Sequence, residues 1–227
     1  MIDRDDFPIN EIPYVTFRDV SFAWPGKNEH LISKCNFSIT KTGLWMIVGK
    51  NGSGKSTLVK LINGILEPTH GFIDCLASMG MVFQNPDHQI LMPNCRSELL
   101  LNLNQNLSRK EINIKIDDAL NKVGLTGFDK RPVNTLSGGQ KQRLTIACAL
   151  ISDRNFVLMD EPTALLDSES QLKVLRIIKD LTNNKSNPFT ALWITHRLEE
   201  LVYADGVAEM RDGNLSAWHK PSNFQYK

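Results

Sequence analysis

The chain has 227 residues, of which 41% are hydrophobic and 22% charged, so it is large enough to bury one well-filled core. Its formal net charge of +1 argues against a strongly basic surface that binds nucleic acid. The four cysteines lack metal-ligand spacing, and we expect small buried hydrophobes in a reducing compartment. The acidic start, residues 1–6, lacks the apolar core of a secretory signal, and no apolar run approaches the ~18 residues of a membrane-spanning helix.

Two stretches near the start, residues 14–22 and 35–39, alternate apolar and polar side chains and predict an antiparallel hairpin. Trp24 interrupts this pattern, immediately before Pro25-Gly26. A flat ring at this place can stack on a purine, and such stacking can contribute ~1–3 kcal/mol. The alternative is an aromatic side chain packed at the tip of the hairpin, in which case Tyr14 is the next stacking candidate.

A glycine-rich stretch follows the apolar run 44–48 and precedes a helix-like run at 58–62. Its pattern, Gly-x4-Gly-Lys-Ser, lets backbone N–H groups surround an anion, and the helix N-terminus adds positive charge. Lys55 supplies a charge for the β- and γ-phosphates, and the Ser56 hydroxyl is suited to ligate Mg²⁺. This phosphate loop consists of Gly49, Lys50, Asn51, Gly52, Ser53, Gly54, Lys55, Ser56 and Thr57.

A short strand predicted at 79–83 is followed by Gln84. An amide at the carboxyl end of a strand is well placed to contact Mg²⁺ or a water near a γ-phosphate. The same segment also fits ordinary turn chemistry, because Asn-Pro-Asp comes next. Further along, residues 93–125 break the alternation of strands and helices, and Ser108 with Glu111 forms a capping box before apolar residues at helical spacing. This texture predicts an inserted helical subdomain.

A second candidate anion site lies at the start of a predicted helix near residue 138. Ser137 and Gln140 match a capping box, which is the structural alternative to a binding role. The two glycines between them leave the helix N-terminus bare of side chains, and such an end can bind an anion. The residues of this signature are Leu136, Ser137, Gly138, Gly139 and Gln140.

Two predicted buried strands end in polar residues. The first runs into Asp160, which can hold Mg²⁺ through its water shell, and Glu161, which can orient or deprotonate an attacking water. The last strand ends in His196, whose ring can contact a γ-phosphate. Parallel sheets bind ligands at the carboxyl ends of their strands, so we expect these residues at one edge with Ser56 and Gln84. A closing hairpin is predicted near Asp212-Gly213, and a loose tail after Trp218.

Together these motifs resemble the ATP-binding-cassette (ABC) ATPases from about residue 14 to 215. The phosphate loop, a Q-loop at Gln84, the signature, Asp160-Glu161, a D-loop ending in Asp167 and the switch His196 occur in family order. The resemblance implies an α/β fold, namely a P-loop NTPase (RecA-like) core with an N-terminal antiparallel β subdomain and an inserted α-helical signature subdomain. It implies a single domain over 1–227, with the core at about 12–84 and 152–215 and the helical subdomain at about 86–151.

The same resemblance implies ATP hydrolysis with Mg²⁺ by two domains facing head to tail, as a homodimer or a heterodimer with a second ABC ATPase subunit. The signature of one subunit then completes the site on the phosphate loop of the other. Glu161, His196 and Gln84 are the implied catalytic residues. The implied Mg²⁺ ligands are Ser56, Gln84 and Asp160, and Trp24 stands where the adenine-stacking residue is commonly a tyrosine.

Residues 83–89 are similar, more narrowly, to the ATPases of energy-coupling-factor (ECF) importers, including the cobalt/nickel and vitamin types. This implies a peripheral protein on the cytoplasmic face of the cell membrane, acting with an integral membrane scaffold and a substrate-capture subunit, and no nucleic acid. A related ATPase acting on DNA ends is disfavoured, because only about fifty residues separate Gln84 from Ser137, too few for a coiled-coil arm. A soluble ABC ATPase that serves as an assembly scaffold is the alternative.

Overall fold

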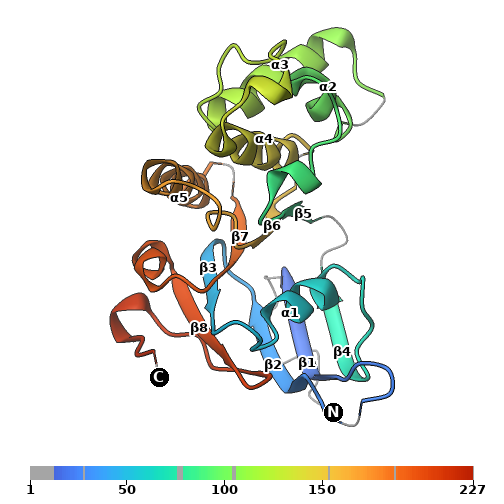
Figure 1. Ribbon diagram of the computed structural model, residues 1–227, viewed down its shortest axis with the longest axis vertical. Helices are drawn as coiled ribbons and strands as arrows, with labels where there is room; N and C mark the ends of the chain where they lie inside the picture. Colours follow the sequence, from blue (N-terminus) through green and yellow to red (C-terminus); the bar gives the residue numbers. More distant parts are fainter. Residues whose placement is uncertain are drawn as a thin grey trace. The chain divides into compact units, whose positions relative to one another are not determined.

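The computed structural model describes residues 13–27, 29–75, 79–103, 106–152, 154–186 and 188–226 (Figure 1). Two compact units divide the chain: the first comprises residues 1–77 and 195–227, and the second comprises residues 78–194. The acidic start and residue 12, where the predicted core begins, lie outside the described residues. Within the described ranges, every helix falls short of the length and apolar character that a membrane span requires.

An antiparallel sheet of three strands opens the first unit. The central strand β1 (Val15–Phe22) pairs with β2 (Ile32–Ile39) on one side and with β4 (His70–Cys75) on the other. The predicted hairpin is therefore confirmed. Burial alternates along the second half of β2, whereas β1, which contains register shifts, is buried at both of its ends. The buried rings of Phe17 and Phe37 stack with centroids 4.6 Å apart.

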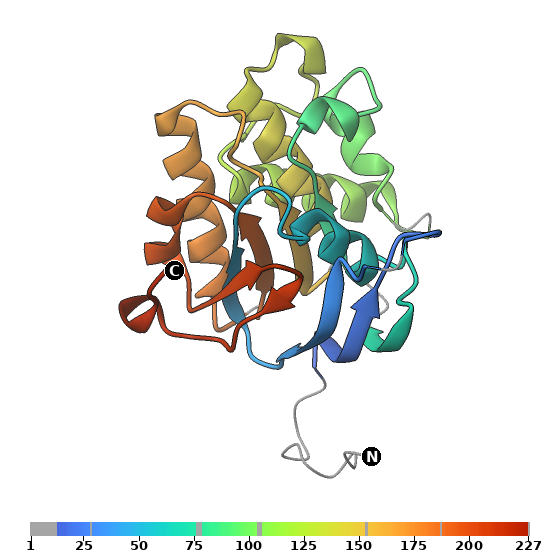
Figure 2. The same cartoon turned by 60° about the horizontal axis from the view of Figure 1, so that its bottom comes forward.

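The phosphate loop also belongs to the first unit, where it connects β3 (Gly43–Val48) to α1 (Lys55–Ile62). Strand β3 pairs in parallel with β8 (Gly206–Arg211), which turns back antiparallel into β9 (Asn214–Leu215), as Figure 2 shows. Nearly the whole of β3 is buried, which anchors the loop at its start. The predicted closing hairpin is confirmed.

The C-terminal tail is held against the first unit, so the prediction of a loose tail after Trp218 is wrong. The Trp218 indole N–H donates to the Ser38 carbonyl at 3.1 Å, and its ring meets Trp45 edge-on with centroids 5.0 Å apart. His219 and Val207 exchange two backbone hydrogen bonds of 2.8 Å each, and a short 3-10 helix, Pro221–Asn223, follows. Aromatic packing and these hydrogen bonds offset the chain entropy that favours a loose end.

Three parallel strands form the centre of the second unit: β5 (Gly80–Val82), β6 (Phe156–Asp160) and β7 (Thr190–Thr195). Strand β7 is buried along its whole length, and the largest side chain on it, Trp193, has no exposed surface. Such continuous burial explains why these strands read as apolar runs and not as alternating patterns.

Helices make up the rest of the second unit: α2 (Cys95–Leu100), α3 (Arg109–Lys122), α4 (Gly138–Leu150) and α5 (Ser168–Thr182). Helices α2, α3 and α4 contact one another and gather at one end of Figure 1. Two short 3-10 helices lie in the connections, Pro86–His88 and Val133–Thr135, and a third, Leu198–Tyr203, lies in the first unit. The predicted mixed α/β class, with one antiparallel and one parallel set of strands, is confirmed.

The four cysteines carry free thiols, and three of them, Cys35, Cys95 and Cys148, are buried. Desolvation raises the pKa of Cys35 to about 12 and that of Cys75 to about 11. Because the thiolate is the reactive form, such thiols are inert at neutral pH. The prediction that they act as small hydrophobes is confirmed for the three buried residues, whereas Cys75 is half-buried.

Candidate nucleotide-binding and hydrolysis site

The phosphate loop needs its glycines. Gly52 has φ 83° and Gly54 has φ 105°, both in the left-handed region that residues with a Cβ atom rarely adopt. At Gly49 the constraint is space, because a Cβ atom there would collide with the Met210 carbonyl oxygen of the neighbouring strand β8. The backbone therefore curls tightly, and substitution at any of these three positions strains the loop or forces β8 to move.

Inside the loop, the local chemistry fits an anion. Helix α1 begins at Lys55, and its N-cap residue Gly54 has no side chain, so the first amides of the helix lack a capping side chain. The Lys55 side chain is only 6% exposed, and its ammonium donates to the carbonyls of Gly49 at 2.8 Å and Lys50 at 3.0 Å. The buried Ser53 hydroxyl finds no hydrogen-bond partner among the described residues. An uncapped helix start, a fixed cation and an unpaired hydroxyl are what a phosphate group satisfies.

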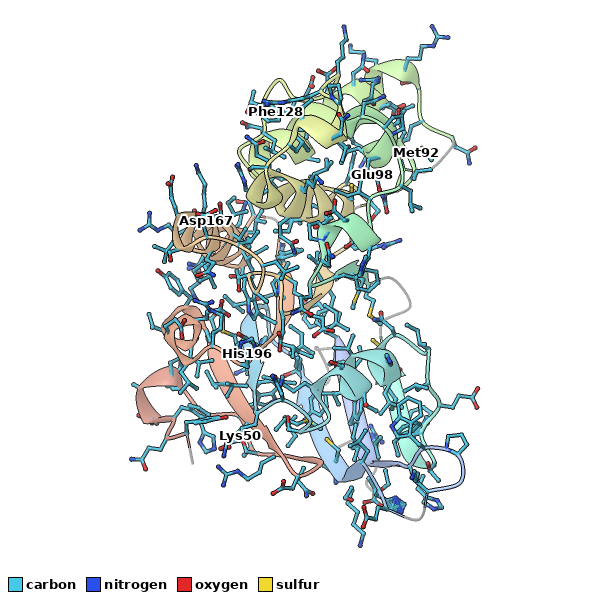
Figure 3. The ribbon with its side chains drawn as sticks, in the orientation of Figure 1. Lys50, Met92, Glu98, Phe128, Asp167 and His196 are labelled. Carbon is cyan, nitrogen blue, oxygen red and sulfur yellow. The ribbon has the colours of Figure 1, made fainter. Side chains whose placement is uncertain are left out.

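An open pocket of about 500 Å³ borders the phosphate loop on the side of β8. Lys50, which is labelled in Figure 3, is one of the residues that line this pocket. The pocket is lined by Lys50, Asn51, Gly52, Ser53, Glu209, Met210, Arg211 and Asp212. The loop is therefore accessible at the surface of the first unit. Ser56, the predicted Mg²⁺ ligand, is exposed at the start of α1.

Trp24 presents an accessible ring in the same unit. Its side chain is 42% exposed, its edge packs against Phe22 at 5.2 Å between centroids, and the Lys60 ammonium lies 5.9 Å from the ring centroid. Lys60 belongs to α1, so Trp24 lies near the helix that the phosphate loop opens. Its role in adenine stacking stays a prediction, as does the fallback, half-buried Tyr14.

In the second unit, two predicted catalytic side chains come together. Strands β5 and β6 run in parallel with Val82 opposite Met159, so both end at the same edge. Just beyond these ends, the Gln84 amide nitrogen lies 3.4 Å from the Glu161 carboxylate and donates to it. Glu161 directly follows β6, and Gln84 lies two residues after the end of β5, so both lie at the strand ends as predicted.

Glu161 is held in an unusual backbone conformation. Its φ is 46°, in the left-handed region, and its N–H donates to the Ile194 carbonyl on β7 at 2.9 Å. A left-handed conformation costs a residue with a Cβ atom about 1–2 kcal/mol, and such strain is concentrated at functional sites. Asp160 is the last residue of β6, and His196, the residue after β7, is exposed in the first unit.

The signature forms a capping box, and its helix N-terminus is also accessible, so both features predicted from its sequence are present. Ser137 accepts a hydrogen bond from the Gln140 amide at 3.3 Å, while its own amide donates to the Gln140 side chain at 3.0 Å, which completes a capping box. Ser137 and Gly138 are nonetheless exposed at the start of α4. The helix start is thus satisfied by its own side chains and still accessible from outside.

The signature and the D-loop lie against each other in the second unit. Asp167 caps α5 by accepting from the Ser170 amide at 2.9 Å and from the Ser170 hydroxyl at 2.8 Å, and these hydrogen bonds hold the pKa of its carboxyl below the ordinary value (Figure 3). A Cβ atom on Gly139 would come within 2.5 Å of the Ser170 Oγ atom. Gly139 therefore permits this close packing of α4 on α5.

Sequence reasoning missed three residues next to the predicted ones: Lys141 and Gln142, directly after the signature, and Asp87, shortly after Gln84. Gln142 is fully buried and donates to the Phe83 carbonyl at 3.1 Å, and Lys141 forms an ion pair with Asp87 at 2.6 Å. The sequence does contain a signal for such contacts, because several polar residues open a helix that is otherwise apolar. Polar side chains that become buried there need hydrogen-bond or ion-pair partners.

Residues 32–164 match the model of a protein family described as ABC transporter. A protein of Arabidopsis thaliana named ABC transporter I family member 10 is 43% identical over 187 residues, which are 82% of this chain and 69% of that protein. The energy-coupling factor transporter ATP-binding protein EcfA1 of Lactobacillus gasseri is 35% identical over 225 residues, which are 91% of this chain and 78% of that protein.

The solved structure of cbiO1 from Clostridium perfringens, described as part of the ABC transporter complex cbiONQ, has a similar fold. The two chains superpose with a TM-score of 0.84 at 28% sequence identity. The match covers 92% of this chain and 89% of that chain. The resemblance stated from the sequence motifs is therefore confirmed.

Proposed function

Because the chain belongs to the ABC transporter family of ATPases, we propose that it hydrolyses ATP with Mg²⁺ to power an ECF-type importer through membrane partner subunits. The observation that carries the hydrolytic part is the pairing of Gln84 with Glu161 at the ends of two neighbouring parallel strands. A carboxylate that accepts from an amide and is fixed by its backbone is prepared to orient one water molecule.

In this proposal Lys55 and the phosphate loop hold the triphosphate, and Trp24 stacks on adenine. Ser56, Gln84 and Asp160 offer a hydroxyl, an amide and a carboxylate, the oxygen donors that Mg²⁺ prefers. Mg²⁺ bound by these groups would neutralise charge that develops on the phosphoryl oxygens. Glu161 orients and deprotonates the attacking water, and His196 contacts the γ-phosphate.

A second subunit completes the proposed site. The exposed helix start at Ser137 and Gly138 would face the γ-phosphate held by the partner subunit, and Asp167 would lie at the contact between the two. The phosphate charges are then met from opposite sides, by Lys55 of one subunit and by a helix N-terminus of the other. Closure of the pair depends on the triphosphate, and loss of its terminal group lets the pair open.

The membrane partners are inferred from similarity to proteins of known families. A relative named as an ECF transporter ATP-binding protein and a structural neighbour from a cbiONQ complex support an integral membrane scaffold and a substrate-capture subunit. The similarity of residues 83–89 to the ATPases of ECF importers, which include the cobalt/nickel and vitamin types, favours a metal ion or a vitamin as the substrate. The chain would then work at the cytoplasmic face of the membrane as a peripheral subunit.

The decisive experiment replaces Glu161 with Gln in the tagged full chain. The amide keeps the size and the neighbour Gln84 but cannot take a proton, so ATP turnover should fall about 10²–10⁴-fold. ATP affinity should stay within about threefold, because Glu161 is not a phosphate ligand. Turnover is measured by phosphate release and affinity by calorimetric titration. Wild-type turnover in Glu161→Gln would remove Glu161 from the role.

The same tagged chain tests the coupling to a membrane. When it is recovered from detergent-solubilised membranes, integral membrane proteins should copurify in a fixed ratio, and Glu161→Gln should retain them together with bound ATP. Recovery only of soluble proteins would contradict the importer and support the scaffold alternative instead.

A further inference from the structure

Three consecutive residues on the second turn of α4 connect the signature helix to three different elements. Lys141 pairs with Asp87 in the 3-10 helix Pro86–His88, and Gln142 donates to the Phe83 carbonyl. Arg143 donates to two carbonyls just after α3. Successive residues on a helix point about 100° apart, so one turn can reach three neighbours at once. Two of these connections flank Gln84, which is predicted to contact Mg²⁺ or a water near the γ-phosphate.

Gln142 holds the backbone next to Gln84. Its side chain has no exposed surface, and its amide nitrogen lies 3.1 Å from the Phe83 carbonyl oxygen. The side-chain oxygen of Gln142, Oε1, is buried without a hydrogen-bond partner among the described residues. A buried, half-satisfied amide costs about 1–3 kcal/mol relative to a satisfied one. A leucine would fill this space without that cost, so the hydrogen bond to Phe83 is the property that sets glutamine apart here.

Lys141 holds the other side of the same segment. Its ammonium lies 2.6 Å from the Asp87 carboxylate, and the Lys141 and Asp87 side chains are 21% and 61% exposed. Asp87 itself is fixed, because its amide donates to the Asn85 side chain at 3.0 Å. The ion pair also lies in an open groove of about 530 Å³ lined by Asp87, Ile90, Leu91, Met92, Pro93, Pro132, Val133, Asn134 and Lys141.

The segment between these two attachments, residues 83–88, is closed on itself and is here named the glutamine segment. The Gln89 side chain accepts from the Phe83 amide at 3.1 Å and donates to the Met81 carbonyl at 2.8 Å. This bridge ties the end of the segment back to its beginning. Gln84 therefore lies in a segment whose two ends are tied to each other and to α4.

Arg143 joins α4 to the rest of the helical region. It is 9% exposed, and one guanidinium nitrogen donates to the carbonyls of Val123 and Gly124 at 2.9 Å each. These carbonyls lie at the C-terminal end of α3, where a cation also complements the helix dipole. Arg143 thus connects α4 to the end of α3.

We propose that Lys141 and Gln142 are positioning residues that latch the glutamine segment to the signature helix. When Gln84 moves during hydrolysis, the latch moves the start of α4 with it, so loss of the γ-phosphate at one site withdraws the signature from the other. The inference rests on the proposed function. It adds to that function a specific link between Gln84 and Ser137, which consists of two side chains of α4.

The exposed ion pair gives the cleaner test, since swapping it leaves the core intact. In the complex recovered through the tagged chain, Asp87→Lys and Lys141→Asp should each lower kcat about threefold to fivefold with KM for ATP within about twofold. The double variant Asp87→Lys/Lys141→Asp should restore kcat. The matched control is the Asp118–Lys122 ion pair on α3, which is 2.7 Å long with side chains 56% and 34% exposed, and its swap should leave kcat unchanged.

Gln142→Leu tests the buried attachment. The side chain keeps nearly the same volume but loses the donor, so kcat should fall about tenfold at nearly unchanged KM and unchanged melting temperature. Equal kcat in the single swaps and the wild type, or a double swap no better than the singles, overturns the latch. If Gln142→Leu does not fold, the ion-pair swaps decide alone. A wild-type complex without ATP turnover would instead overturn the proposed function together with the latch.

Discussion

Two helix N-termini in this chain are predicted to bind phosphate, and they differ in how their backbone amides are satisfied. Helix α1 begins at Lys55 within the phosphate loop, and its N-cap residue Gly54 provides no side-chain cap. Helix α4 follows the signature and begins with a complete capping box between Ser137 and Gln140. Both starts contain glycines and both are expected to meet phosphate, yet only one of them is closed by its own side chains.

The difference matches when each helix is expected to meet its ligand. The phosphate loop is built for an anion bound by its own subunit, so a side-chain cap there would compete with the ligand. The signature is expected to meet a phosphate only when a second subunit arrives. Until then its capping box keeps the helix start ordered, while Ser137 stays exposed at the surface. One site is prepared for binding and the other for docking.

The largest expected effect comes from the uncapped side of the comparison. Lys55→Met removes the one buried ammonium of the phosphate loop, and a lost charged contact of about 2–3 kcal/mol lowers ATP affinity on the order of 30- to 150-fold. Calorimetric titration of the full chain measures this. Lys41→Met, an exposed position of the same unit, is the control and should change affinity less than about twofold. Equal affinities of Lys55→Met and wild type would contradict an anion site at this helix.

A smaller effect is expected on the capped side, where two matching capping boxes allow a controlled test. Ser137→Ala and Ser108→Ala each remove a hydroxyl that caps a helix, so each should lower the melting temperature by about 2–4 °C. Only Ser137→Ala should also lower ATP turnover, by about tenfold, because only its helix is proposed to contact the partner's phosphate. Equal turnover in both variants would show that the signature serine is a cap and nothing more.

The sequence predicted these local features well because each depends on a short stretch. Capping boxes at Ser108 and Ser137, the hairpin of β8 and β9, and the glycines of the phosphate loop follow from residues within a few positions of one another. The meeting of Gln84 with Glu161 was predictable too. It follows from a general rule that neighbouring parallel strands end at one edge.

Contacts between distant segments could not be predicted in the same way. The tail was expected to be loose because nothing near Trp218 indicates a partner, yet Ser38 and Trp45, far earlier in the chain, hold it. The attachment of Gln142 to Phe83 likewise joins residues 59 positions apart. The left-handed φ of Glu161 arises where a strand end, a turn and the Ile194 carbonyl meet, and no residue pattern announces it.

The smallest effect sharpens the comparison with a third helix start, that of α5, which is capped by a carboxylate. Hydrogen bonds from the Ser170 amide, and then from its hydroxyl, hold the pKa of Asp167 below its ordinary value of 3.8. A carboxyl with a lowered folded pKa stabilises the fold above the unfolded pKa, and that contribution is lost as the pH falls through the folded pKa. The unfolded pKa is about 3.8 and the folded pKa is lower, so the Asp167 carboxylate is fully ionised at neutral pH.

Asp167→Asn tests this assignment, since asparagine caps a helix about as well without titrating. The difference in melting temperature between Asp167→Asn and wild type should stay constant from pH 8 to pH 5, because neither cap changes charge in that window. A difference that changes between pH 7 and pH 5 would mean that Asp167 titrates near neutrality, against the lowered pKa. Constancy would show that the carboxylate cap of α5 keeps its charge throughout this range, so that it caps the helix as steadily as the hydroxyl caps α4.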